Sequence, residues 1–401
     1  MEMNKLTPYE FWEKIGRPKK VVAPMVDHCE LAYRMMTRKY GADLVYTQMY
    51  NANSFVYSKE LRASLTTCPE DRPLIVQFAG HDPDQLLKAA KYVEHMCDAV
   101  DLNLGCPQGI AKRGRYGAFL MDEVDLLVDI VSTMSKGLSI PVTCKVRIYK
   151  DYDRTIKLCE ALVNAGASLL TVHGRTREEK GQLVGEVDWK TIARIKQHFA
   201  NRPVPIPIIA NGGIECLQDV YKCLEITGAD GVMSSEGILE NPALYMESLN
   251  AQGEFQTQLM QTEEYLNNCL KYPVHHMKCV RSHVMKMLHR YTTVHVELRD
   301  MIGLSHTFDD YFNVCNRVRA LMEESGRVDK DYTCSWYRRY RETIEKDENG
   351  EDVKIIKPTY TTKDKLVDMT TSFLNSGDGE NVWGEEGSEE CGGSIFDSLF
   401  A

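Results

Sequence analysis

The chain has 401 residues, of which 43% are hydrophobic and 26% charged, as in folded globular proteins. The net charge of −10 is concentrated in segment 375–401, which carries seven acidic residues and no basic one. The absence of an apolar run of about 18 residues argues against a transmembrane helix. Thirteen cysteines without a Cys-x-x-Cys pair argue against a zinc site or a disulfide framework and favour a reducing compartment.

Eight short runs rich in β-branched residues recur along the chain and are expected to be strands. The runs are 21–25, 44–47, 74–78, 100–104, 142–146, 169–173, 208–211 and 231–233. Segments of helical periodicity lie between them, such as 84–95 and 155–165. Eight alternations of strand and helix predict an α/β fold, a (β/α)8 TIM barrel, in preference to an open doubly wound sheet.

Polar side chains recur at the C-terminal ends of the predicted strands. The positions are Gln77, Asn103, Lys145, His173 and Asn211. In barrels of this kind the active site is built at that rim. Polar residues scattered at random along the strands would not gather at one end. The pattern therefore predicts a site at the C-terminal rim.

A single cysteine, Cys106, follows the fourth predicted strand. Gly105 allows a sharp turn there, and Pro107 fixes the direction of exit. A thiol at this place is positioned to donate a proton to a substrate lying over the strand ends. The alternative is a buried structural cysteine, because free cysteine is among the most buried residue types. The polar rim favours the functional interpretation.

The last two strands indicate a phosphate site. Asn211, Gly212 and Gly213 form a flexible turn with free backbone N–H groups, and Glu236-Gly237 follows the eighth strand. Loops after strands 7 and 8 commonly bind phosphate in TIM barrels.

A more basic region follows the barrel. Segment 271–290 contains five Lys or Arg residues, four histidines and no acid, with helical periodicity at Val280, Val284, Met287, Leu288 and Tyr291. Aromatic and cationic residues recur in 336–341. Such groups suit contact with phosphates and bases, although a solvated helix face is the alternative. Disorder is expected from about residue 375, and the apolar end 394–400 is either a docking peptide or without a role.

At this point the chain resembles the tRNA-dihydrouridine synthases, a family of FMN-dependent barrels. Six motifs carry the resemblance: Ala23-Pro24-Met25-Val26-Asp27, Gln77-Phe78-Ala79-Gly80, Asn103-Leu104-Gly105-Cys106-Pro107, Lys145-Val146-Arg147, His173-Gly174-Arg175-Thr176 and Asn211-Gly212-Gly213-Ile214. Segment 108–117 resembles the eukaryotic branch that acts on positions 16 and 17 of the D-loop. One departure is visible, because many members have Gly-Arg where this chain has Ser235-Glu236.

The resemblance implies reduction of the uracil C5=C6 bond in tRNA, with FMN reduced by NADPH. It implies that Cys106 is the catalytic acid, that Lys145 lies near the flavin N1–C2 edge and that His173 binds flavin. Substrate binding is assigned to Asn103, Arg147 and Arg175. The implied cofactor-binding residues are Pro24, Met25, Val26, Gln77, Lys145, His173, Asn211, Gly212, Gly213, Glu236 and Gly237.

The expected organisation has three parts. Residues 1–260 form the FMN-binding barrel, 261–341 a helical tRNA-binding domain and 342–401 an acidic, partly disordered tail. We expect tRNA as partner and neither a metal nor a membrane, whereas the oligomeric state stays open. The N-terminus lacks the apolar stretch of a secretory signal, so the expected location is the cytoplasm, with the nucleus as a further compartment.

Two alternative functions stay open from the sequence. One is an FMN-dependent reductase of a free pyrimidine, similar to dihydroorotate dehydrogenase. The basic helical region argues against it, because a small substrate needs no such platform. The other is a tRNA-binding chaperone that has lost catalysis, against which the presence of Cys106, Lys145 and Asn103 argues.

Overall fold

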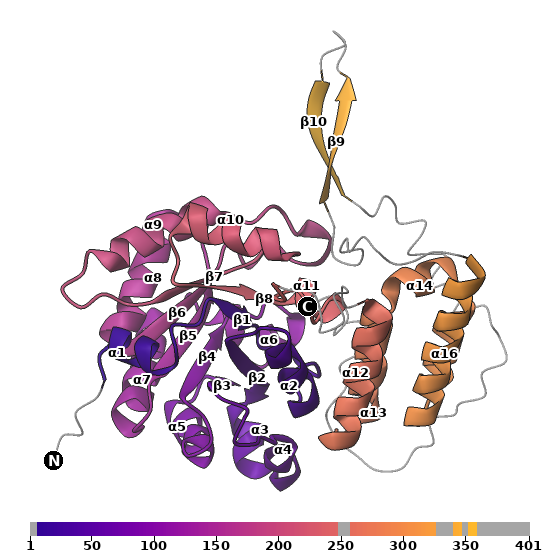
Figure 1. The fold of residues 1–401 in the computed structure, drawn as a ribbon. Coiled ribbons are helices and arrows are strands. Elements are labelled where there is room, and N and C mark those ends of the chain that lie inside the picture. The colour runs from indigo at the N-terminus through magenta and orange to yellow at the C-terminus, as the bar shows by residue number, and fades with distance from the viewer. Residues whose placement is uncertain (1–5, 248–256, 326–339, 347–351, 359–401) are drawn as a thin grey trace. The chain divides into compact units, whose positions relative to one another are not determined.

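A closed barrel of eight parallel strands forms the first part of the chain (Figure 1). The computed structural model describes residues 6–247, 257–325, 340–346 and 352–358. The strands are β1 Lys20–Val22, β2 Leu44–Asn51, β3 Leu74–Ala79, β4 Ala99–Leu104, β5 Val142–Arg147, β6 Ala167–His173, β7 Ile208–Asn211 and β8 Gly231–Ser234. Each overlaps one predicted run, and β8 pairs with β1, which confirms the predicted (β/α)8 barrel.

Helices alternate with the strands. They are α1 Pro8–Lys14, α2 Leu31–Lys39, α3 Ala52–Tyr57, α4 Lys59–Ser64, α5 Pro83–Val93, α6 Gly109–Arg113, α7 Val124–Gly137, α8 Tyr152–Asn164, α9 Trp189–Ala200, α10 Leu217–Thr227 and α11 Glu236–Glu240, with the 3-10 turns η1 Gly117–Phe119 and η2 Gly181–Leu183. Asp82 and Asp151 cap α5 and α8, because each carboxylate accepts two backbone N–H groups of the first turn. These caps explain where the two predicted helices begin.

Successive side chains along a strand point to opposite faces of the sheet, so each barrel strand has one set that faces inward and one set that faces outward. The outward set, including Val22, Val76 and Leu102, packs against the helices. The inward set is apolar near the strand starts, where Val21 and Ile75 pack in one cluster with Phe11 and Trp12 of α1 and its neighbours. The inward positions further along the strands carry the polar residues of the rim. One face of each strand therefore changes from core to candidate site along its length.

In the described residues five helices follow the barrel, and α12 lies beside both α13 and α16 (Figure 1). The helices are α12 Gln258–Lys271, α13 Met277–Met287, α14 His289–Val294, α15 Glu297–Leu304 and α16 Phe308–Ser325. α12 packs against α2 of the barrel, and α13 packs against α11. Val280, Val284 and Met287 are fully buried, which confirms the predicted apolar face of α13. The boundary predicted near residue 260 stays a prediction.

The cations of α13 differ in exposure, and the phosphate contact predicted for this region stays a prediction. Lys278 is exposed, but Lys286 is only 2% exposed. Arg281 donates to the carbonyl of Ser305 at 2.9 Å, and His283 is fully buried. The helix covers these residues by packing against α11 and the loop after β1, which helical periodicity alone does not reveal.

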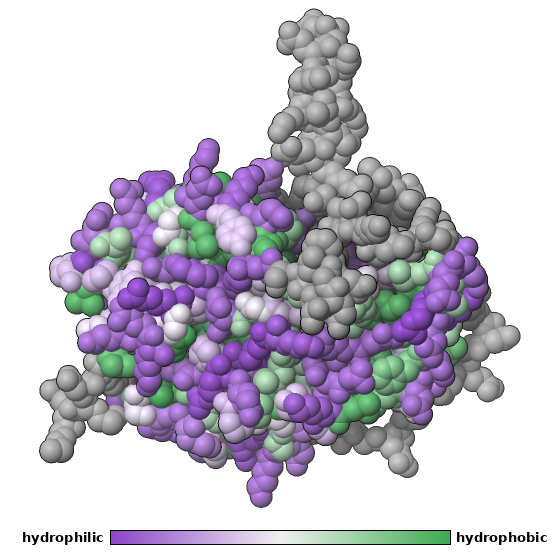
Figure 2. All heavy atoms as spheres, in the orientation of Figure 1, coloured by the Kyte–Doolittle hydropathy of each residue, from purple (hydrophilic) through white to green (hydrophobic). Residues whose placement is uncertain are grey.

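Beyond the helices, β9 Tyr340–Lys346 and β10 Asp352–Pro358 pair as antiparallel strands, which were not predicted. The aromatic and basic positions 336–339 and the predicted disordered tail lie outside the described residues. Hydrophobic residues are dispersed among hydrophilic ones on the face shown in Figure 2. None of the helices described here is long and apolar enough to cross a membrane.

A buried ion-pair network ties α2 to the start of β3. Asp71 is fully buried, and its carboxylate lies 2.6 Å from Arg34 Nη2 and 3.1 Å from Arg38 Nε. Asp71→Asn keeps the shape but leaves two largely buried guanidinium groups without their anion. We expect the free energy of unfolding to fall by about 3–5 kcal/mol, measured by urea denaturation. The matched control Glu13→Gln removes an exposed ion pair with Arg17 and should change it by less than about 1 kcal/mol. Equal effects of the two substitutions would contradict the role of Asp71.

Candidate active site at the barrel mouth

The structure brings the predicted polar rim together on neighbouring strands. Asn103 of β4 is in register with Lys145 of β5, and His173 of β6 is in register with Asn211 of β7. Gln77 of β3 is joined to Asn103 by a side-chain hydrogen bond of 2.8 Å. All five occupy inward positions at the carboxyl ends of their strands. The predicted site is therefore one contiguous rim.

A hydrogen-bond chain supports this rim from inside the barrel. Buried Asp101 accepts from Gln77 Nε2 at 2.8 Å and from Thr143 Oγ1 at 2.5 Å. Gln77 Oε1 in turn accepts from Asn103 Nδ2. Burial raises the pKa of Asp101 to about 6, although the two donated hydrogen bonds oppose the shift. Sequence reasoning missed Asp101, although an acid on an inward strand position was a visible signal.

Asn103 shapes the loop that carries Cys106. Its Oδ1 accepts from the backbone N–H of Gly105 at 3.1 Å and of Cys106 at 3.0 Å. Because Nδ2 already donates to Gln77, one N–H of the amide is left for a ligand. The main observed role of Asn103 is therefore to position the loop, and the substrate contact predicted for it stays a prediction.

Cys106 is partly buried in a tightly packed loop. The Ala118 N–H donates to its carbonyl at 3.0 Å, and a Cβ added to Gly117 would lie 2.7 Å from the same oxygen. Met49 and Tyr116 belong to the apolar cluster around the cysteine. Burial raises the pKa of the Cys106 thiol despite the cations nearby, so the thiol is protonated near neutral pH. The loop therefore holds a protonated thiol, and the role of Cys106 as the catalytic acid stays a prediction.

Cations gather beside this loop. Lys145 has no carboxylate within ion-pair distance in the described part of the chain, and its Nζ would lie 3.8 Å from a Cβ on Gly105. Burial and the neighbouring Arg147 lower the pKa of Lys145 to about 8. Arg147 donates to the carbonyls of Gly105 at 2.7 Å and Thr176 at 2.9 Å. Most of its guanidinium is thus used to hold loops, and its predicted contact with substrate stays a prediction.

His173 is neutral in this cationic surrounding. Burial, followed by the charges of Arg147 and Lys145, holds its pKa well below the usual value. Arg175 Nη1 lies 3.2 Å from His173 Nε2, and an arginine only donates, so Nε2 accepts and Nδ1 carries the proton. Arg175 also donates to the carbonyl of Gly185 at 2.8 Å. The ring therefore offers its Nδ1 N–H, rather than a positive charge, to a ligand.

The loops after β7 and β8 are packed against each other. Gly212 and Gly213 have φ of +105° and +74°, a region that favours glycine. A Cβ on Gly212 would lie 2.8 Å from His173 Cδ2, and one on Gly237 would lie 2.6 Å from the Ile214 carbonyl oxygen. Asn211 Nδ2 donates to the Met233 carbonyl at 2.9 Å, joining the two strands. These contacts hold the loops expected to bind phosphate.

The remaining predicted cofactor residues lie in the loops that follow β1 and β8. Pro24 and Met25 are partly buried after this strand, and Val26 is 47% exposed. Glu236 begins α11 directly after β8, and its charge acts on Arg147, whose pKa burial lowers to about 10. The strand-1 and strand-8 loops thus border the same mouth as the cationic residues.

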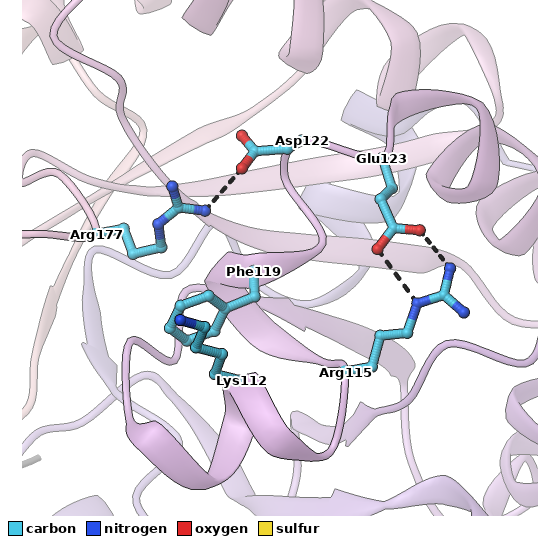
Figure 3. Close-up of a pocket in the computed structure, with 6 residues that line it drawn as sticks. All are labelled: Lys112, Arg115, Phe119, Asp122, Glu123 and Arg177. Atoms are coloured by element: carbon cyan, nitrogen blue, oxygen red, sulfur yellow. Dashed lines mark hydrogen bonds and ion pairs between the residues drawn. The ribbon is translucent and has the colours of Figure 1, made fainter.

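An open cavity of about 480 Å³ lies beside the Cys106 loop (Figure 3). Its cations are partly paired, since Arg115 lies 2.5 Å from Glu123 and Arg177 lies 2.9 Å from Asp122. The Arg177 guanidinium is 5.3 Å from the centre of the Phe119 ring. Within the described ranges, no group of three His, Cys, Asp or Glu residues could hold a metal ion.

The contact between Gly117 and Cys106 yields a test. Gly117→Ala adds a methyl group 2.7 Å from the Cys106 carbonyl oxygen at a φ of +67°, so the cysteine loop must move. We expect Cys106 to become accessible and to be alkylated by iodoacetamide several-fold faster, as measured by peptide mass spectrometry. Gly228→Ala is the matched control, because Gly228 has a φ of +60° but no atom within 4 Å of an added Cβ. Equal alkylation rates would contradict the enclosure.

Comparison with known proteins identifies the family. A family model described as dihydrouridine synthase (Dus) matches residues 21–333. A Rattus norvegicus protein named as similar to tRNA-dihydrouridine(16/17) synthase is 43% identical over 326 residues, covering 80% of this chain and 72% of the rat protein. A Schizosaccharomyces pombe tRNA-dihydrouridine(16/17) synthase is 39% identical over 345 residues, covering 82% of this chain and 86% of the yeast protein. The resemblance read from the motifs is confirmed, and the chain belongs to the dihydrouridine synthase family.

Proposed function

We propose that this chain reduces uridines at positions 16 and 17 of the tRNA D-loop to dihydrouridine, with FMN as cofactor and NADPH as reductant. As a dihydrouridine synthase, the chain is an NAD(P)-dependent oxidoreductase acting on uridine in tRNA. The positions are those in the relatives' names, which also give NAD(P) without choosing between NADPH and NADH. The observation that carries the proposal is a protonated, partly buried thiol beside Lys145, which has no ion-pair partner among the described residues.

The mouth fits a flavin that carries a phosphate. Lys145, Arg147 and Arg175 place positive charge at the rim, whereas His173 is neutral and Asp101 is buried below. When bound, FMN supplies hydride transfer, and the cations match both its phosphate and the negative charge of the reduced ring. We assign Lys145 and His173 to the ring system. The other proposed cofactor contacts are Pro24, Met25, Val26, Gln77, Asn211, Gly212, Gly213, Glu236 and Gly237.

The residues of the chain donate the proton, position the loop of Cys106 and orient the uracil. Cys106 donates the proton to C5 of the uracil, because its thiol is protonated near neutral pH. Asn103 holds the loop of Cys106 through two backbone N–H groups. Its remaining amide N–H, together with Arg147 and Arg175, orients the uracil edge. Enclosure of the thiol also limits its contact with water.

A uridine inside folded tRNA is stacked, so it must leave the stack to reach this mouth. The chain then needs contacts with the tRNA backbone outside the barrel. Exposed Lys278, Lys112 and Arg115 are candidates for phosphate contact. Lys278 lies 3.6 Å from Asp27 of the loop after β1, and Lys112 and Arg115 follow the Cys106 loop. A reductase of free pyrimidine would need none of them. A location in the cytoplasm, with the nucleus as a further compartment, is part of the proposal.

Cys106→Ala tests the proton donor. Dihydrouridine formation in tRNA should fall by about 10²- to 10⁴-fold, the usual contribution of a positioned acid. Oxidation of NADPH should continue, because that half-reaction does not use the thiol. The measurements are mass spectrometry of incubated tRNA and NADPH absorbance. Cys68→Ala is the control, since Cys68 is partly buried before β3, at the opposite end of the barrel. A normal dihydrouridine yield from Cys106→Ala would show that Cys106 is a structural residue. A wild-type protein that binds tRNA but forms no dihydrouridine would instead support the alternative of a tRNA-binding chaperone.

Lys145→Met tests the cation at the ring. The substitution keeps the apolar stem and removes the charge, so FMN affinity should fall by about tenfold, as for the loss of one charge-assisted hydrogen bond. Flavin fluorescence titration measures this affinity, and stopped-flow absorbance measures reduction by NADPH. Lys136→Met is the control, because exposed Lys136 lies near the end of α7, away from the mouth. Unchanged FMN affinity together with an unchanged rate of flavin reduction would refute the role of Lys145.

A further inference from the structure

Lys286 is a buried lysine on α13, one of the helices that follow the barrel, and its side chain contacts a loop of the barrel. It lies on α13, is only 2% exposed, and its Nζ is 3.1 Å from both Ser282 Oγ and His28 Nε2. His28 belongs to the loop after β1 and is 6% exposed. Two segments far apart in sequence therefore meet at this ammonium group.

The hydrogen bonds around Lys286 leave one of its donors unused. His28 Nδ1 lies 2.7 Å from the Val26 carbonyl oxygen and donates to it. Burial, followed by the charges of Lys286 and His283, holds the pKa of His28 well below its usual value, so the ring is neutral and Nε2 accepts. An ammonium group has three N–H donors, and two are used by Ser282 and His28. The third has no hydrogen-bond acceptor among the residues described.

The charge of Lys286 also lacks a close partner. In the described part of the chain, no carboxylate lies within ion-pair distance of its Nζ. Burial lowers the pKa of Lys286 to about 8, and the charge of Glu236 opposes this shift. Glu236 begins α11, which packs against α13, and the same carboxylate acts on Arg147. Lys286 and Arg147 therefore border one mouth from different parts of the chain.

Burying an ammonium group without a counter-ion is costly, and such groups are concentrated at functional sites. Lys286 lies next to the loop after β8, one of the two loops that commonly bind phosphate in TIM barrels. That loop is packed against the loop after β7, with Gly237 against the Ile214 carbonyl. An incoming anion would accept the unused N–H and would supply the missing charge.

We propose that Lys286 binds a phosphate group at the strand-8 side of the mouth, so that the helices after the barrel complete an anion site of the barrel. The inference rests on the proposed function, which supplies two sources of this chemistry. One is the phosphate monoester of FMN, and the other is a phosphodiester beside the uridine that leaves the tRNA stack. The two sources are separable by experiment.

The first arm compares FMN with riboflavin, which lacks the phosphate. Flavin-free wild type, Lys286→Met and the control Lys136→Met are titrated with each flavin by fluorescence. If Lys286 binds the FMN phosphate, Lys286→Met should lose about tenfold of the preference for FMN over riboflavin, with riboflavin affinity unchanged. Lys286→Arg should keep the preference because it keeps the charge. Lys286→Gln replaces Lys286→Met if the latter does not fold.

The second arm measures tRNA affinity across a salt series for the same proteins. If Lys286 binds a tRNA phosphate, the FMN preference stays and the salt slope falls by about 0.7–0.9 relative to Lys136→Met. Either result supports the proposal and identifies the source of the phosphate. No change in either arm would overturn it and leave Lys286 as a structural link between α13 and the loop after β1. If the wild-type protein binds neither FMN nor riboflavin, the proposed cofactor is refuted. The tRNA measurements would still test the role of Lys286.

Discussion

A hydrogen-bond chain inside the barrel fixes the geometry of the mouth. Asp101 accepts from Gln77, Gln77 accepts from Asn103, and Asn103 accepts two backbone N–H groups of the loop that carries Cys106. Each side chain occupies an inward position, so the register of β3 and β4 determines the whole chain. A slip of one residue would turn these polar groups toward the helices, where no partner would offset their desolvation. The position of the thiol is therefore a consequence of strand register.

The second constraint is the balance of charge. Burial and the charge of Arg147 lower the pKa of Lys145, whereas burial and the charge of Arg175 lower the pKa of Arg147. Lys286 adds a third buried cation, whose pKa is lowered by burial. Asp101 lies deeper in the barrel and Glu236 lies at its edge, so these acids do not pair with all three. Such an arrangement costs folding free energy that an anionic ligand would restore on binding. The site is therefore organised for a negatively charged ligand.

Much of the barrel was predictable, because β-branched runs and polar strand ends are local features of the sequence. The rim positions Lys145 and His173 followed from the same pattern. What failed depended on contacts between distant segments. Helical periodicity identified the apolar face of α13 but not the packing that buries Lys286 and engages Arg281. The internal role of Asn103 was equally hidden, because an amide on a strand end is the same in sequence whether it binds a ligand or a loop.

The opposing influences on Cys106 explain why the thiol is enclosed. Arg147, Lys145 and Lys180 all favour the thiolate, and an acid placed among such cations would lose its proton if it were exposed. Burial outweighs these charges, and the pKa of Cys106 is raised rather than lowered. The cations needed for an anionic ligand and the proton needed for catalysis are thus compatible because the packing of Gly117 against Cys106 helps to bury the thiol. Enclosure of the thiol is therefore a requirement of the proposed chemistry.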